Sequence, residues 1–175
     1  MKKERLVLGG GCFWCLEAVY SNVKGVLSAI SGYTGGKRAN PSYENVCTGA
    51  TGHAEIVDIT YDAHSISLAE LLKIFFVVHN PTTLNQQGAD RGTQYRSVIY
   101  YANAEEKAEI AKAIALAQKD FSDTIVTEVS LLGDVYPAEG YHQNYYAQNA
   151  AQGYCQVVIA PKLQKFMLTF PDKVG

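Results

Sequence analysis

The feature that most constrains this chain is a turn of three glycines that ends in a cysteine. Gly9-Gly10-Gly11 follows a short apolar run, Leu6-Val7-Leu8, which predicts a buried strand. In residues 13–20, directly after Cys12, apolar side chains recur at helical spacing without glycine or proline, which predicts a helix. The glycines therefore connect a strand to a helix, and Cys12 lies at or just before the first helical turn.

The start of a helix favours an anion, because its backbone N–H groups are unpaired and the helix dipole is positive there. A thiolate is such an anion, and it is the reactive form of cysteine. The alternative is a buried structural cysteine, as most free cysteines are. The position of Cys12 favours a reactive thiol.

Length and composition indicate an ordinary globular protein. With 175 residues the chain can bury a sizeable core, and we expect residues 1–175 to form a single catalytic domain. A net charge of -2 and scattered lysines and arginines give no reason to expect a nucleic acid or membrane partner. The first apolar run is too short for a signal peptide, so we expect a cytoplasmic protein. Four cysteines in that compartment indicate redox or metal chemistry rather than a structural disulfide framework.

Further along, strands and helices alternate. Apolar patterns predict strands at residues 26–33, 53–61, 95–101 and 125–132. Cap signals open helices near Ser67 and Asn103. The other expected segments are polar loops at 37–52 and 82–93, a short helix at 138–149, a brief strand after Cys155, and a last short helix from Pro161. The order matches a split β-α-β unit, so we expect an α+β fold: a two-layer sandwich with a mainly antiparallel sheet and a ferredoxin-like core.

Several side chains are candidates for chemistry. Cys12 and Cys15 are three residues apart on a first helical turn and can form a disulfide. Glu55 alternates in phase with Val57 and Ile59, so it faces either an apolar side or, as an edge-strand residue, the solvent. On an apolar side desolvation would keep the carboxyl protonated, as a general acid requires.

Two tyrosines belong to the long polar loops or follow them. The hydroxyls of Tyr43 and Tyr95 are protonated donors near neutral pH, suited to an acceptor oxygen. Asp90 and Arg91 are equally consistent with a local ion pair and with a catalytic role.

Seven segments in order closely resemble the peptide methionine sulfoxide reductase family of the A type, and together they cover nearly the whole chain. They are Gly11-Cys12-Phe13-Trp14, Ser31-Gly32-Tyr33-Thr34-Gly35-Gly36, Tyr43 with Val46-Cys47, Thr51-Gly52-His53-Ala54-Glu55, Gly92-Thr93-Gln94-Tyr95-Arg96-Ser97, Tyr141-His142-Gln143 and Gly153-Tyr154-Cys155.

The resemblance implies reduction of the S epimer of methionine sulfoxide, free or in oxidised proteins, with thioredoxin or dithiothreitol as reductant and no bound cofactor or metal. It implies Cys12 as nucleophile and Glu55 as proton donor. It further implies that Tyr43 and Tyr95 bind the sulfoxide oxygen, that Phe13 and Trp14 line the methyl pocket, and that Asp90 is an acidic residue of the site. We expect a monomer.

The thiol that resolves the Cys12 sulfenic acid is left open by two departures from the family. Many members have glycine at the position of Cys15, and many end in a flexible glycine-rich tail with a further cysteine. We favour Cys155, which falls on a resolving position of the family, over Cys15, which is nearer in sequence. An exchange that uses both thiols is also chemically allowed. Cys47 is interpreted as structural.

Two other functions fit parts of the sequence. The Cys12-x-x-Cys15 pair is compatible with a general thiol–disulfide oxidoreductase. Cys12, Cys15, Cys47 and Cys155 together are compatible with a zinc module, although structural zinc ribbons usually have two C-x-x-C knuckles.

Overall fold

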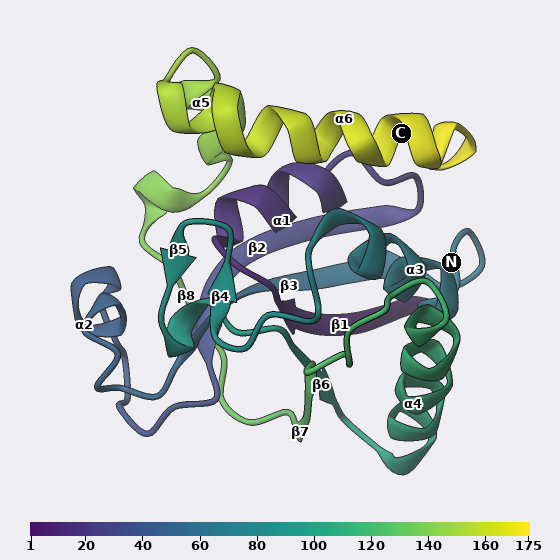
Figure 1. Cartoon of the computed structure of the whole chain (residues 1–175), viewed down its shortest axis with the longest axis horizontal. Helices are drawn as coiled ribbons and strands as arrows, with labels where there is room; N and C mark the ends of the chain where they lie inside the picture. Colours follow the sequence, from purple (N-terminus) through teal and green to yellow (C-terminus); the bar gives the residue numbers. More distant parts are fainter.

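The computed structural model describes all residues, 1–175, and shows an α+β fold built on one six-stranded sheet (Figure 1). The strands of this sheet are β1 (Lys3–Gly9), β2 (Val26–Thr34), β3 (Ala54–Asp62), β6 (Val98–Tyr101), β7 (Glu128–Leu131) and β8 (Tyr136–Pro137). They lie in the order β7-β6-β1-β3-β2-β8, and every pairing is antiparallel except that of β6 with β7. The expected α+β class and mainly antiparallel sheet are confirmed.

Helices cover one face of the sheet. The α-helices are α1 (Phe13–Tyr20), α2 (Tyr43–Cys47), α3 (Leu68–Val78), α4 (Ala104–Gln118), α5 (Tyr145–Asn149) and α6 (Ala160–Thr169). Three short 3₁₀ helices, η1 (Thr93–Tyr95), η2 (Gly140–His142) and η4 (Pro171–Lys173), and one π-helix, η3 (Cys155–Ile159), complete the chain. In Figure 1 α6 crosses the top of the molecule above α1, and it also contacts α3. None of these helices is both long enough and apolar enough to cross a membrane.

The main core lies between the sheet and the helices. Side chains that alternate along β1 and β3, such as Leu6, Leu8, Val57 and Ile59, point into it and meet apolar residues of α1, α3, α4 and α6. The opposite face carries a smaller cluster, which includes Val7 and packs against the segment after β7. Glu55 is in phase with Val57, so the strand directs its carboxyl to the helix side, beneath α1.

Local cap signals are satisfied as the sequence predicts. Ser67 Oγ accepts the Glu70 N–H at 3.1 Å, while Glu70 Oε1 accepts the Ser67 N–H at 3.2 Å, which is the capping box of α3. Asn103 Oδ1 accepts the Glu106 N–H at 2.9 Å and caps α4. Each cap satisfies N–H groups that would otherwise be unpaired at the helix start.

Several expected boundaries are wrong. The polar loops contain α2 and a small hairpin of β4 (Gln86–Gln87) with β5 (Asp90–Arg91), β6 begins three residues after Tyr95, and residues 138–149 divide into η2 and α5. The strand expected after Cys155 is instead the π-helix η3, which continues directly into α6. β-Branched residues there favoured a strand, but Cys155 and Ile159 are buried in helical geometry against the cluster around α1.

Candidate active site

The glycine turn brings three elements together at Cys12. Gly11 has φ of 91°, a conformation that favours glycine, and its N–H donates to the Tyr95 carbonyl at 3.1 Å. A Cβ at Gly9 would lie 2.6 Å from the Glu55 carbonyl oxygen, so β1 approaches β3 more closely than a side chain allows. The turn therefore holds Cys12 next to the segments that carry Glu55 and Tyr95.

Cys12 is the N-cap residue of α1, as predicted, but its thiol does not cap the helix. The Phe13 N–H, the first of the helix, donates instead to Glu55 Oε1 at 3.1 Å. Burial raises the pKa of the Cys12 thiol well above its ordinary value, and a hydrogen bond to Cys15 and the nearby Glu55 raise it further. Burial therefore opposes the effect of the helix start on the Cys12 thiol.

Three of the four cysteines lie in one buried cluster. Cys12, Cys15 and Cys155 belong to the same group of packed side chains, which spans α1 and η3. The hydrogen bond from Cys12 lowers the pKa of Cys15, and the Cys15 charge in turn raises that of Cys155, after the larger effect of burial. Cys47, interpreted as structural, is exposed on α2 and is not part of this cluster.

Glu55 is fully buried, which confirms that it faces the apolar side. Burial raises the pKa of its carboxyl to about 8, so the group is mainly protonated at neutral pH. Oε1 accepts the Phe13 N–H, whereas Oε2 is buried without any hydrogen-bond partner. The proton therefore belongs on Oε2, the atom that is free to donate it.

The two predicted tyrosines lie close to this acid. Tyr43 lies on α2 and Tyr95 on η1, and both are half-buried. Burial and, next, the charge of Glu55 raise the pKa of both hydroxyls, which stay protonated donors.

Aromatic rings form the opposite wall. Phe13 is buried, with its ring centroid 5.6 Å from Tyr33 and 6.2 Å from Tyr43. The Trp14 indole stacks on Tyr145 with centroids 3.6 Å apart and planes 6° from parallel. The first turn of α1 therefore presents the thiol and two large apolar surfaces together.

Asp90 is linked to the cysteine cluster through Tyr154. Its Oδ2 accepts the Tyr154 hydroxyl at 2.8 Å, and Tyr154 packs against the cluster. Asp90 and Tyr154 line a cleft of about 660 Å³, with Lys162 of α6 at its edge. Asp90 makes no ion pair with Arg91, and its charge contributes to the raised pKa of Glu55.

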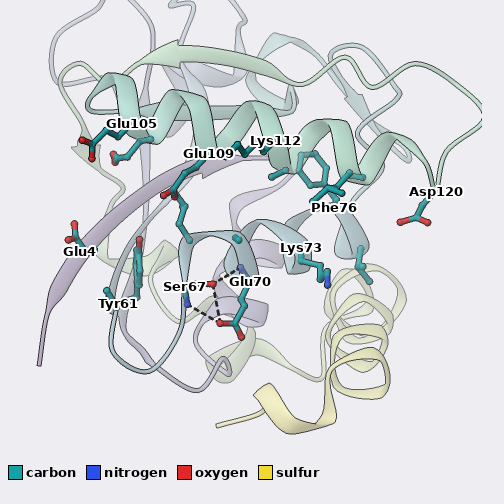
Figure 2. Close-up of a pocket in the computed structure, with 18 of the residues that line it drawn as sticks. Glu4, Tyr61, Ser67, Glu70, Lys73, Phe76, Glu105, Glu109, Lys112 and Asp120 are labelled. Carbon is teal, nitrogen blue, oxygen red and sulfur yellow. Dashed lines mark hydrogen bonds between the residues drawn. The ribbon is translucent and has the colours of Figure 1, made fainter.

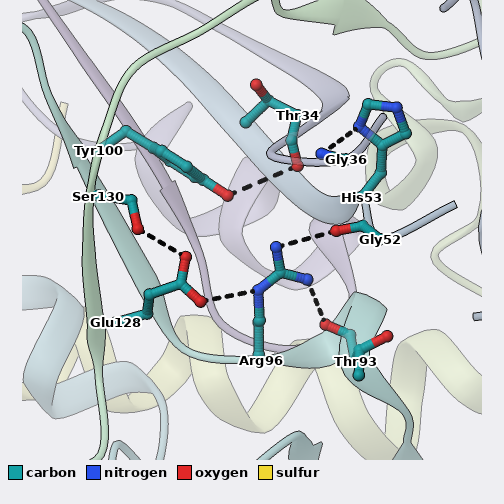
Figure 3. A network of polar contacts seen from close by, with 9 residues as sticks. All are labelled: Thr34, Gly36, Gly52, His53, Thr93, Arg96, Tyr100, Glu128 and Ser130. Atoms are coloured by element: carbon teal, nitrogen blue, oxygen red, sulfur yellow. Dashed lines mark hydrogen bonds and ion pairs between the residues drawn. The ribbon is translucent and has the colours of Figure 1, made fainter. Parts of the chain in front are cut away.

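A polar network supports the strand and turn that carry Glu55 and Tyr95 (Figure 3). Arg96 donates to the carbonyls of Thr93 at 2.9 Å and Gly52 at 3.0 Å, and its Nε lies 3.3 Å from a Glu128 oxygen. One guanidinium thus links η1, the approach to β3, and β7.

The sequence interpretation gave no role to several residues that the fold brings to the site. Glu139 Oε1 accepts the Tyr33 hydroxyl at 2.9 Å, and its Oε2 accepts the Tyr43 N–H at 3.0 Å, so it fixes α2 against β2. Tyr145, Tyr154 and His142 complete the aromatic wall. Of these, Tyr154 and His142 lie in two of the seven segments that carry the family resemblance, and the resemblance was the only indication in the sequence that they belong to the site.

A groove larger than the cleft at Asp90 lies elsewhere. It has a volume of about 1110 Å³ between α3 and α4 and contains none of the predicted site residues (Figure 2). No three His, Cys, Asp or Glu side chains are arranged to hold a metal ion. The four cysteines therefore do not form the zinc centre of the alternative hypothesis.

Comparisons with known proteins point to one family. The family model for peptide methionine sulfoxide reductase matches residues 4–174. A curated relative from Polynucleobacter asymbioticus, "Peptide methionine sulfoxide reductase MsrA", is 59% identical over 98% of this chain and 92% of that protein. One from Nitratiruptor sp. with the same name is 57% identical over 97% of each. Reduced Mxr1 from Saccharomyces cerevisiae aligns with a TM-score of 0.82 at 33% identity, covering 88% of this chain and 90% of that one. Matches of this identity over almost the full length place the chain in the peptide methionine sulfoxide reductase family.

Proposed function

We propose that the chain reduces methionine S-sulfoxide, free or in oxidised proteins, to methionine, with Cys12 as the nucleophile. The observation that carries this proposal is the pairing of a buried cysteine with a neutral carboxyl whose free Oε2 has no partner in the protein. A sulfoxide needs both, because its oxygen leaves sulfur only when protonated.

The first half-reaction transfers the sulfoxide oxygen to the enzyme. Cys12 sulfur attacks the sulfoxide sulfur while Glu55 Oε2 gives its proton to the oxygen, which Tyr43 and Tyr95 hold by hydrogen bonds. The hydroxyl then passes from the substrate sulfur to the Cys12 sulfur, so the sulfur–oxygen bond and the transient sulfur–sulfur bond both break and the electron pair of the latter stays on the methionine sulfur. Methionine is the two-electron reduced product, and Cys12 becomes a sulfenic acid. Phe13 and Trp14 receive the methyl group, since sulfur and its substituents pack well on aromatic rings.

The second half-reaction regenerates the thiol through both remaining buried cysteines. The Cys15 N–H donates to the Cys12 carbonyl at 3.1 Å and both thiols lie in one buried cluster, which supports attack of Cys15 on the sulfenic acid with release of water. Cys155 packs in the same buried cluster as Cys15, which supports a following exchange that forms a Cys15–Cys155 disulfide and frees Cys12. In this order Cys15, the alternative of the sequence analysis, resolves the sulfenic acid, and Cys155 then joins Cys15 in the disulfide that the reductant attacks.

Thioredoxin is the proposed reductant of that disulfide, with dithiothreitol able to replace it and no cofactor required. Yeast Mxr1 has itself been solved in complex with Trx2. A cluster of reduced cysteines fits a reducing compartment, so we propose a cytoplasmic location. We also propose that the protein acts on its substrate as a monomer. As a finer description of the fold, the order β6-β1-β3-β2 supports a ferredoxin-like core within one domain that spans residues 1–175.

The test is turnover of the two separated methionine sulfoxide epimers with thioredoxin. We expect reduction of the S epimer alone, because inverting the sulfur exchanges a polar and an apolar substituent and leaves the buried donors unpaired. Equal rates on both epimers would contradict the proposed pocket. Faster insulin reduction by dithiothreitol in the presence of the protein would instead favour a general thiol–disulfide oxidoreductase.

A further inference from the structure

His142 makes one hydrogen bond that the proposed reaction does not use. Its Nδ1 lies 3.1 Å from Nε1 of Trp14, and the ring is 2% exposed. The imidazole also lies against Phe13 and Tyr43, with centroids 5.2 Å and 4.4 Å away. The imidazole therefore contacts Phe13 and Trp14, the two residues that line the proposed methyl pocket, and it donates a hydrogen bond to neither.

The protonation state of His142 follows from its partner. An indole N–H can only donate, so Nδ1 must be the unprotonated acceptor and the proton of the neutral ring must be on Nε2. Nε2 is buried without a partner. Burial lowers the pKa of His142, which agrees with a neutral ring.

The backbone around His142 is fixed to both sides of the site. The Gln143 side chain accepts the Ser31 N–H at 3.0 Å and donates to the Ser31 carbonyl at 2.9 Å, so it pairs with β2 as a strand would. The Asn144 N–H donates at 2.9 Å to Glu17 Oε1, and Glu17 is a buried residue of α1, the helix that carries Trp14. His142 is thereby held at a set distance from the indole.

We propose that His142 is a positioning residue that fixes the Trp14 indole by accepting its N–H, and so sets the size of the pocket for the sulfoxide methyl group. The inference rests on the proposed function, since it assumes that Trp14 receives the methyl. Stacking on Tyr145 restrains the tilt of the indole but permits it to slide in its own plane. The hydrogen bond to Nδ1 is directional and fixes that remaining freedom.

The test compares His142→Phe, which keeps the ring but removes the acceptor, with His142→Asn, whose Oδ1 replaces Nδ1 as acceptor. The exposed His64→Asn is the matched control. One readout is the ratio of kcat/KM for methionine sulfoxide to kcat/KM for ethionine sulfoxide, which differ by one methylene. One methylene in a fitted pocket is worth about 10–200-fold. We expect His142→Phe to lower this ratio about tenfold or more, and His142→Asn to restore most of it.

The second readout does not depend on activity. Trp14 is the single tryptophan, so indole fluorescence anisotropy reports on it alone. We expect the anisotropy of the free enzyme to fall in His142→Phe and to recover in His142→Asn. An unchanged substrate ratio and anisotropy in His142→Phe, or an Asn variant that behaves like the Phe variant, would overturn the inference. A wild type inactive on both sulfoxides would refute the proposed function, while the anisotropy series would still decide the His142–Trp14 contact.

Discussion

Cys12 is subject to two opposing effects at the scale of single residues. The first N–H groups of α1 favour a thiolate, but burial and neighbouring groups raise the pKa of the thiol. At neutral pH Glu55 is mainly protonated, so its negative charge, one of the causes of that rise, is largely absent. The same proton that the sulfoxide oxygen receives therefore also makes the thiolate easier to form, and the two groups act as one unit.

We expect Cys12→Ser to abolish methionine formation, including a single turnover, because a serine hydroxyl is a far weaker nucleophile than a thiolate. Cys47→Ser is the control, since this thiol lies outside the buried cysteine cluster. It should keep nearly full steady-state turnover. Rapid-quench measurement of methionine decides the matter, and a burst from the Cys12 variant would show that another group attacks the sulfoxide.

Glu55→Gln should bind substrate but form methionine about 10²–10⁴-fold more slowly, because an amide has no acidic proton to give. In wild type the single-turnover rate should fall as pH rises through about 8, the pKa of this buried carboxyl. The variant should lose that decline. Single-turnover rates between pH 6 and 9 test both statements, and an unchanged rate in the variant near neutral pH would exclude Glu55 as the acid.

At the scale of elements, regular strands and helices could be predicted from the sequence, whereas the π-helix could not. β1, α1, β3 and α3 carry strong periodicity or a capping box, and each was expected close to its observed place. The π-helix η3 was mistaken for a strand, because local β-branched residues favour a strand and the sequence does not show what packs on them.

The site shows the same division. Alternation along one strand put Glu55 in phase with Val57 but left open whether that side is apolar or exposed, and the assembled fold shows that it is buried. Glu139 and Arg96 were given no role because their partners lie far away in the chain: Glu139 contacts Tyr33, and Arg96 contacts Gly52. Pairings of that kind depend on the assembled sheet. No spacing in the sequence marks them.

The junction of α1 and η3 leads to a prediction about recycling. After one equivalent of sulfoxide without reductant, peptide mapping should find a Cys15–Cys155 disulfide in wild type and a Cys12–Cys15 disulfide in Cys155→Ser. Cys15→Ser should lose thioredoxin-dependent turnover, because Cys15 lies one helical turn from Cys12 and packs with Cys155 in the same buried cluster. Full recycling by Cys15→Ser, with a mapped Cys12–Cys155 bridge, would instead show direct resolution by Cys155.

At the scale of the whole molecule, the fold keeps several ionisable groups neutral in its interior. Burial raises the pKa of Glu55 to about 8 and also raises that of Glu17, whereas it lowers the pKa of His79 to about 3. The carboxyls bind protons more tightly in the folded state, so their contribution to stability is full at low pH and is lost as pH rises. The lowered pKa of His79 acts in the opposite direction. It destabilises the folded state only where the pH lies below 6.5, the ordinary pKa of this side chain.

Above pH 6.5 the contribution of Glu55 is therefore no longer opposed by His79. From its ordinary pKa of 4.5 up to about 8, the folded state holds a proton on Glu55 that the unfolded chain has released. Each pH unit in this window should lower the free energy of unfolding by up to about 1.4 kcal/mol relative to a variant without the group.

Glu55→Gln should thus be more stable than wild type at neutral pH, by an amount that grows as pH rises to 8. Urea unfolding under reducing conditions at pH 5, 6.5 and 8 measures this difference. Glu105→Gln, exposed on α4, is the control and should follow wild type. A Glu55→Gln advantage that stays constant with pH would mean that this carboxyl is ionised in the folded protein, and it could then not deliver the proton that the reaction requires.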